Sequence, residues 1–79
     1  MYLTRVSLKK ADRKTVEEAL KWCRLCRSRD ETFQFHVRGT FIIIESPTKA
    51  QAFKRGQALY RKFALHYNVE KKTRVTLKS

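Results

Sequence analysis

Cations placed near aromatic rings are the residues of this chain best suited to chemistry. Binding a single-stranded nucleic acid requires flat π surfaces on which bases stack and positive charges that hold phosphates. The stretch from Phe33 to Ile44, FQFHVRGTFIII, combines aromatic and basic residues. Phe41 could stack a base in this way. The side chains that could hold the phosphate backbone beside it are Arg5, His36, Arg38 and Arg74.

A second group of cations falls on one predicted helix. Lys54, Arg55, Arg61 and Lys62 are expected to point away from its apolar stripe, as a ridge that tracks phosphates without reading bases. Solvated helix faces usually mix both signs of charge, yet residues 47–69 contain no acidic residue. A membrane-surface helix would share this pattern, but so small a domain needs the apolar stripe for its core. We therefore expect a nucleic acid, and no membrane, at this helix.

The two cysteines give a weaker signal, for a metal site. Cys23 and Cys26 form a C-x-x-C motif that His36 and His66 could complete as a zinc set. Both cysteines lie on the predicted buried stripe of a helix, where free Cys behaves as a small hydrophobic residue. The sequence contains no second C-x-x-C and no H-x-x-x-H motif. We therefore expect neither a metal nor another cofactor.

Catalysis finds little support in the residue pattern. The acidic residues mostly lie at the ends of predicted elements, with no pair that must share a pocket. The chain has no Gly-rich phosphate loop and no nucleophile–base spacing. One enzymatic alternative is a small ribonuclease with His36 as base and neighbouring cations stabilising phosphate charge. We expect a protein that is not an enzyme.

The elements that position these residues follow from hydrophobic periodicity. Alternation over residues 2–8 predicts a strand, and a helix follows that is capped either by Asp12 or by Thr15. A second helix is expected from an N-cap at Ser46 to about Tyr67, with an apolar stripe that is mainly aromatic. That stripe consists of Phe53, Gly56, Tyr60, Phe63 and Tyr67. Residues 73–77 alternate again and predict a last strand.

The stretch from Phe33 to Ile44 is predicted to form a hairpin that turns at Arg38-Gly39, because Gly supplies the positive φ of a tight turn. This register places His36 opposite Phe41. Opposed residues share a face, so one side is wholly apolar and the other carries Gln34, His36, Phe41 and Ile43.

The resulting order is β-α-β-β-α-β, which predicts one α+β domain of the ferredoxin-like, split βαβ type. A four-stranded antiparallel sheet should carry both helices on one face and leave the other face open. The stretch Arg38-Gly39-Thr40-Phe41 is similar to the Arg-Gly-aromatic opening of the third-strand motif in RNA recognition motifs, with the aromatic residue displaced by one position. The likeness extends over this stretch and the strand order, and neither the fold nor the function is based on it.

The composition agrees with a positively charged domain that binds a ligand. The 79 residues contain nineteen Lys and Arg against seven Asp and Glu, a formal net charge of +12. Such an imbalance is usually tolerated where a polyanion neutralises it. The leading hypothesis is a small basic RNA- or DNA-binding protein, with single strands favoured. The alternatives are a module that docks on an acidic protein or nucleoprotein, and a homodimer formed through the open sheet face. Without a signal peptide or disulfide framework, a cytoplasmic location is expected.

Overall fold

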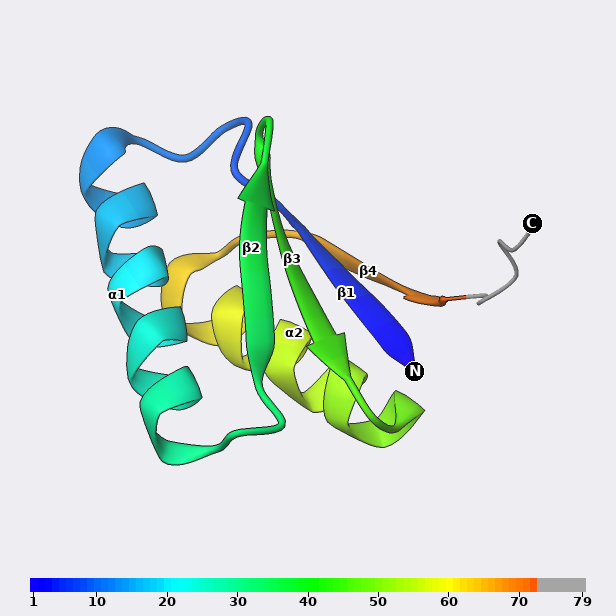
Figure 1. The fold of residues 1–79 in the computed structure, drawn as a ribbon. Helices are drawn as coiled ribbons and strands as arrows, with labels where there is room; N and C mark the ends of the chain where they lie inside the picture. The colour runs from blue at the N-terminus through cyan, green and yellow to red at the C-terminus, as the bar shows by residue number, and fades with distance from the viewer. Residues whose placement is uncertain (73–79) are drawn as a thin grey trace.

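Six secondary-structure elements follow one another in the predicted order. The computed structural model describes residues 1–72. Its elements are β1 (Tyr2–Ser7), α1 (Arg13–Arg29), β2 (Gln34–Arg38), β3 (Phe41–Ser46), α2 (Lys49–Phe63) and β4 (Tyr67–Lys71). The strands form one antiparallel sheet in the order β2-β3-β1-β4 (Figure 1). The predicted ferredoxin-like α+β arrangement is confirmed, with the first and third strands at the centre of the sheet.

One hydrophobic core lies between the sheet and the two helices. Val6 on β1 and both Ile42 and Ile44 on β3 are completely buried. They belong to one cluster with Cys23 of α1 and Leu59 of α2. Because both helices contribute to this cluster, they cover the same face of the sheet. Within residues 1–72, no helix covers the opposite face, as the sequence predicted.

The β2–β3 hairpin turns at residues 39–40, one residue later than predicted. Arg38 pairs with Phe41, whereas the predicted register placed His36 opposite that ring, an error of two residues. Gly39 has φ 61°, and a positive φ at the first of two turn residues is typical of a type II′ hairpin. A shift of two residues is a full period of the pleat. Every side chain of the hairpin therefore stays on its predicted face.

Helix α1 begins at the first of the two predicted caps. The N–H of Thr15 donates a hydrogen bond to Asp12 Oδ1 at 2.8 Å, so Asp12 is the N-cap and Thr15 lies inside the first turn. The helix ends at Arg29, and the N–H of Asp30 donates to the Cys26 carbonyl oxygen at 2.9 Å. The loop that follows leads directly into the hairpin.

Helix α2 is shorter at both ends than the sequence predicted. Thr48, not Ser46, is the N-cap, since its Oγ1 accepts a hydrogen bond from the Gln51 N–H at 3.2 Å. The helix stops at Ala64, which has φ 56°, a left-handed conformation common at helix C-termini. Tyr67, predicted to close the helix, begins β4 instead. The predicted strand over residues 73–77, with Arg74, lies outside the described residues.

The buried face of α2 consists of small and aliphatic side chains, so the predicted aromatic stripe is wrong in part. Ala52, Gly56 and Leu59 are buried. Phe53 and Tyr60 are 44% and 48% exposed. The side of α2 that faces the sheet therefore carries small and aliphatic residues. The rings of Phe53 and Tyr60 lie at the margin of this interface.

Gly56 allows the Tyr67 ring of β4 to lie directly against α2. A Cβ atom on Gly56 would overlap the ring atoms Cγ, Cδ2 and Cε2 of Tyr67. The ring that was predicted to extend the helical stripe thus packs onto the helix from the neighbouring strand. Tyr67 fills the space over Gly56. The rings of Phe53 and Tyr60 therefore lie to the side of this contact.

Gly56→Ala should destabilise the protein, although Gly→Ala inside a helix normally stabilises by about 1 kcal/mol. The added methyl group must displace the Tyr67 ring, and overpacking of this kind costs about 1–3 kcal/mol. We expect a lower free energy of unfolding in urea, with a smaller loss in a Tyr67→Ala background. Gln57→Ala, at the adjacent exposed position, is the control and should change stability by less than about 0.5 kcal/mol. A stabilised Gly56→Ala protein would contradict the contact.

Candidate nucleic-acid interface

The open face of the sheet brings together four of the predicted contact residues. Arg5 of β1 stands opposite Ile43 of β3, and Ile43 stands opposite His36 of β2. Phe41 and Arg38 form the next pair on this face, closer to the hairpin turn. Since opposed residues share a face, the fold places these side chains on one surface. Their role in binding stays a prediction.

Phe41 lies beside a cation and is accessible to solvent. The guanidinium carbon of Arg5 is 5.7 Å from the centre of the Phe41 ring, within the range of a cation–π interaction. Arg5 Nη2 also lies 3.0 Å from Glu70 Oε1, and this ion pair holds the guanidinium near the ring. Phe41 is 36% exposed, whereas Ile43 in the middle of the face is 7% exposed. A ligand on this face can therefore contact the Phe41 ring.

Charge is distributed unevenly along the open face. At the hairpin end, Arg38 is exposed and forms no ion pair within residues 1–72. At the other end, Glu45 Oε2 lies 3.8 Å from Lys72 Nζ, and Glu70 is paired with Arg5. A polyanion would meet carboxylates at that end. The hairpin end is the favourable part of the face for phosphate groups.

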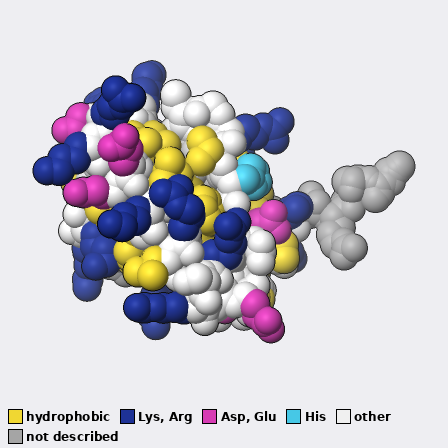
Figure 2. Space-filling view, turned by 60° about the vertical axis from the view of Figure 1, so that its left-hand side comes forward, with side chains coloured by type: hydrophobic (Ala, Val, Ile, Leu, Met, Phe, Trp, Pro, Cys, Tyr) yellow, Lys and Arg dark blue, Asp and Glu magenta, His cyan; other side chains and the backbone are white. Residues whose placement is uncertain are grey.

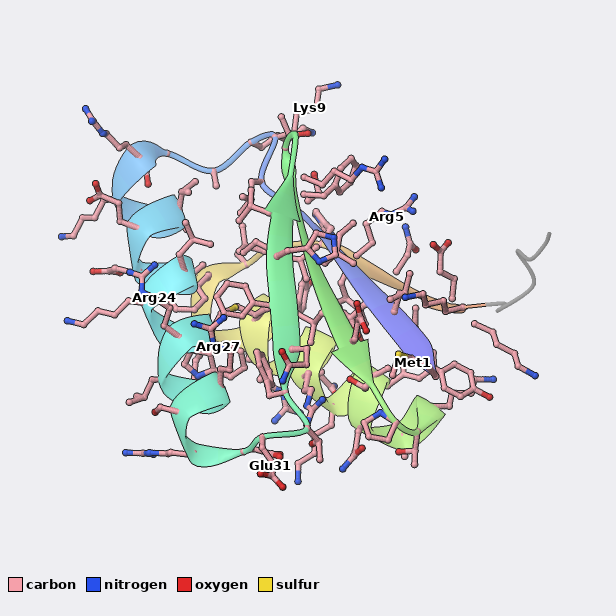
Figure 3. The ribbon with its side chains drawn as sticks, in the orientation of Figure 1. Met1, Arg5, Lys9, Arg24, Arg27 and Glu31 are labelled. Carbon is pink, nitrogen blue, oxygen red and sulfur yellow. The ribbon has the colours of Figure 1, made fainter. Side chains whose placement is uncertain are left out.

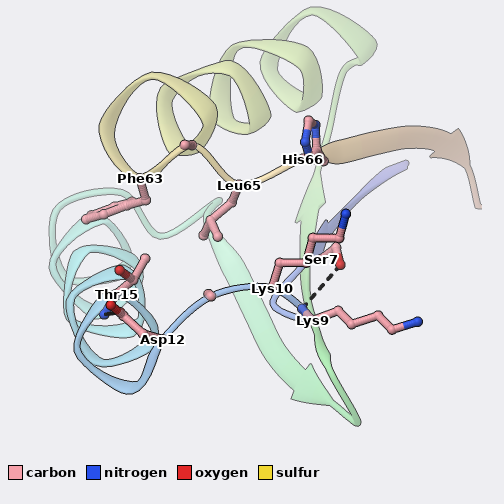
Figure 4. Close-up of a pocket in the computed structure, with 10 residues that line it drawn as sticks. Ser7, Lys9, Lys10, Asp12, Thr15, Phe63, Leu65 and His66 are labelled. Atoms are coloured by element: carbon pink, nitrogen blue, oxygen red, sulfur yellow. Dashed lines mark hydrogen bonds between the residues drawn. The ribbon is translucent and has the colours of Figure 1, made fainter.

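Two lysines that the sequence analysis did not select extend this basic end. The N–H of Leu8 donates to the Thr40 carbonyl oxygen at 2.7 Å, which holds the segment after β1 against the hairpin turn. Lys9 and Lys10 follow, and Figure 3 shows Lys9 beside the hairpin tip. With His66 they line a cavity of about 360 Å³ (Figure 4). Their position depends on the pairing of two loops, which the spacing of residues in the sequence does not indicate.

The cations of α2 do not form the single outward ridge that the sequence predicted. Lys54, Arg61 and Lys62 are exposed. The Arg55 side chain is only 11% exposed. Three of the four predicted side chains thus remain accessible to a ligand.

Arg55 makes structural contacts, and its predicted outward orientation is wrong. Its Nη1 donates to Ser46 Oγ at 2.9 Å, and its Nη2 donates to Asp30 Oδ2 at 3.1 Å. The guanidinium carbon lies 4.8 Å from the centre of the Phe33 ring. A largely buried cation requires such partners. Its N–H groups are therefore engaged within the fold and are not available to a phosphate.

Basic side chains also surround an apolar band on the α1 side of the molecule (Figure 2). On α1, the Arg27 guanidinium carbon lies 5.3 Å from the centre of the Phe35 ring. Leu25 and Val37 are each 48% exposed. Val37 was predicted to face inward, but β2 is an edge strand and α1 leaves this residue half uncovered. Positive charge therefore extends around the molecule beyond the open sheet face.

The two cysteines are free thiols on the inner side of α1. Burial raises the pKa of Cys23 to about 12, and burial also raises the pKa of Cys26. Raised pKa values make thiols poor nucleophiles at neutral pH. Within residues 1–72, no group of three His, Cys, Asp or Glu side chains is arranged to hold a metal ion. The geometry of the pair matches packing in a helix.

The titration of Asp30 offers a test of the Arg55 contacts. Hydrogen bonds from Thr32, and then the nearby charge of Arg55, lower the pKa of Asp30 below its ordinary value of 3.8. A carboxylate with a lowered folded-state pKa stabilises the fold above its unfolded pKa and loses that contribution as the pH falls through the folded pKa. Asp30→Asn should therefore be less stable than the parent protein in urea at neutral pH, and the difference should narrow below about pH 4.

The neighbouring carboxylate provides the control. The Glu31 side chain makes no hydrogen bond or ion pair within residues 1–72. Glu31→Gln should therefore leave the free energy of unfolding nearly unchanged at every pH. A deficit for Asp30→Asn that stays constant down to pH 3 would mean that the charge of Asp30 does not contribute.

No helix within residues 1–72 has the length and apolar character needed to cross a membrane.

Comparisons with protein-family models, with curated proteins and with solved structures find no match to this chain. The similarity to RNA recognition motifs therefore stays a likeness of strand order and one short stretch.

Proposed function

We propose that this chain is a non-enzymatic nucleic-acid-binding protein that favours single strands. The observation that carries the proposal is the accessible Phe41 ring, with Arg5 beside it and Arg38 opposite it on a sheet face that no helix covers. An unpaired base can stack on such a ring while the cations hold the adjoining phosphates. Lys9 lies beside the hairpin tip, at the same end of the molecule as Arg38 (Figure 3).

The charge balance supports a polyanionic ligand. The formal net charge is +12, and ion pairs within residues 1–72 involve only four basic residues, Arg5, Arg13, Arg55 and Lys72. Most basic side chains in this part of the chain therefore have no acidic partner. Unpaired like charges repel one another in the compact state. Phosphates would relieve this repulsion, and the release of their counterions would drive binding.

The alternatives differ in what they require of the open face. An acidic protein would use the same cations, but the exposed Phe41 ring adds a surface that an unpaired base fits. A homodimer through this face would bring two chains together that each carry a formal net charge of +12. A ribonuclease using His36 would need a second acid–base group, and the carboxylates of this face, Glu45 and Glu70, are both held in ion pairs. We place the protein inside the cell, in the cytoplasm, where it meets nucleic acid.

Binding should weaken log-linearly with salt, because each neutralised phosphate releases counterions. For single strands the slope is about −0.7 per phosphate contact, so Arg38→Gln should reduce its magnitude by about that amount. Arg13→Gln removes the same charge from the N-terminal turn of α1, away from the open face, and should leave the slope unchanged. The measurement is fluorescence anisotropy of a labelled oligonucleotide between low and moderate salt. No binding at low salt to single- or double-stranded DNA or RNA would refute the proposal.

Phe41→Ala should weaken single-strand binding by about 1–3 kcal/mol while hardly changing duplex binding, because stacking requires an unpaired base. The ring lies outside the core, so the free energy of unfolding should change little. Phe41→Tyr keeps an aromatic face and should retain the affinity. If Phe41→Ala instead converts a dimer to a monomer in sedimentation and leaves oligonucleotide binding intact, the open face is a protein interface.

A further inference from the structure

Two aromatic rings of α2 are exposed at the margin of its interface with the sheet. Phe53 and Tyr60 are 44% and 48% exposed. They are seven residues apart, which is about two helical turns and about 10.5 Å along the axis. The residue after each ring is an exposed cation, Lys54 after Phe53 and Arg61 after Tyr60. We call the surface formed by Phe53, Lys54, Tyr60 and Arg61 the α2 strip.

Neighbouring groups hold both rings in place. The Phe53 ring meets the Tyr67 ring edge to face, with centroids 6.4 Å apart, and Lys49 Nζ lies 6.0 Å from its centre. The Tyr60 ring lies 5.8 Å from the His66 ring at an angle of 46°. Rings that neighbouring groups already hold lose little conformational freedom when a ligand covers their exposed surface. Both are therefore suited to stacking.

The α2 strip belongs to a segment of the chain whose charges are of one sign. Residues 47–69 contain no acidic residue, so the helix and the start of β4 supply only cations and neutral groups. The four ion pairs within residues 1–72 include neither Lys54 nor Arg61. This alternation of rings and unpaired cations is complementary to a chain of alternating planar bases and phosphates.

We propose that the α2 strip is a second binding surface for single-stranded nucleic acid, on which two bases stack on Phe53 and Tyr60 and phosphates contact Lys54 and Arg61. The inference rests on the proposed function and extends it to a surface separate from Phe41. The rings are about 10.5 Å apart along the helix axis, a distance over which one short single strand can place bases on both rings.

The test compares two double variants that differ only in aromaticity. Phe53→Leu with Tyr60→Leu keeps apolar bulk and removes both rings, whereas Phe53→Tyr with Tyr60→Phe exchanges the rings and keeps both. The probe is a labelled eight-nucleotide oligothymidylate at low salt, followed by anisotropy, with the same length of oligouridylate as the RNA arm. The leucine variant should bind at least about fivefold more weakly, as the loss of base–aromatic stacking implies. The exchanged variant should bind like the parent protein.

Three outcomes would overturn the inference. If the parent protein binds neither oligonucleotide, the proposed function fails and this inference fails with it. If the parent protein binds and the leucine variant, folded by circular dichroism, binds equally well, the α2 strip is not a contact surface, while binding at Phe41 stands. If the leucine substitutions change the sedimenting mass and leave oligonucleotide affinity unchanged, the strip is an interface between proteins. If the two leucine substitutions combined with Phe41→Ala weaken binding more than either change does alone, the α2 strip and Phe41 are two separate contacts.

Discussion

A single buried guanidinium connects segments of the chain that are far apart in sequence. Arg55 of α2 bonds to Asp30 after the end of α1 and to Ser46 at the end of β3, and it lies over the Phe33 ring. The place where α1 stops and the position of α2 on the sheet are thus linked through one side chain. An ion pair of this kind offsets much of its own desolvation cost and adds modest net stability. Its main effect is geometric, because it fixes where the helix ends and the strand end meet.

The remaining cations impose a second constraint, since they are nearly all on the surface of a small domain. A chain of this size buries a small core. Mutual repulsion among its surface charges is therefore considerable in comparison with the stability that the core provides. Two of the four ion pairs within residues 1–72 lie at the end of the sheet that carries Glu45 and Glu70. The cations of the hairpin end and of the α2 strip are in none of the four. Both places therefore combine unpaired cations with accessible aromatic rings, while further unpaired cations lie on α1.

The faces of the sheet could be predicted from sequence more reliably than its register or the limits of α2. Side chains alternate with period two, so an error of two residues in the hairpin left Phe41 on the open face. The C-terminal end of α2 could not be predicted from the sequence, because Tyr67 continues the helical spacing beyond Ala64. Ala64 ends the helix in a left-handed conformation, a position at which Gly is the usual residue. The role of Arg55 was hidden for a different reason. The predicted aromatic stripe leaves both Arg55 and Lys54 outside the core, and the partners of Arg55 come from the loop after α1 and from the end of β3.

The positions of the rings themselves favour a flexible ligand. Phe41 lies on the open face and Tyr60 lies on α2, on opposite sides of the sheet, and β4 forms the edge between them. Neighbouring residues of β4 face opposite sides of the sheet. Asn68 shares the open face with Arg5, whereas the ring of Tyr67 packs on α2. A duplex with a persistence length of about 150 base pairs cannot follow so sharp an edge without a large bending cost. A single strand can turn at individual nucleotides, so contact with both rings would select single strands by shape as well as by stacking.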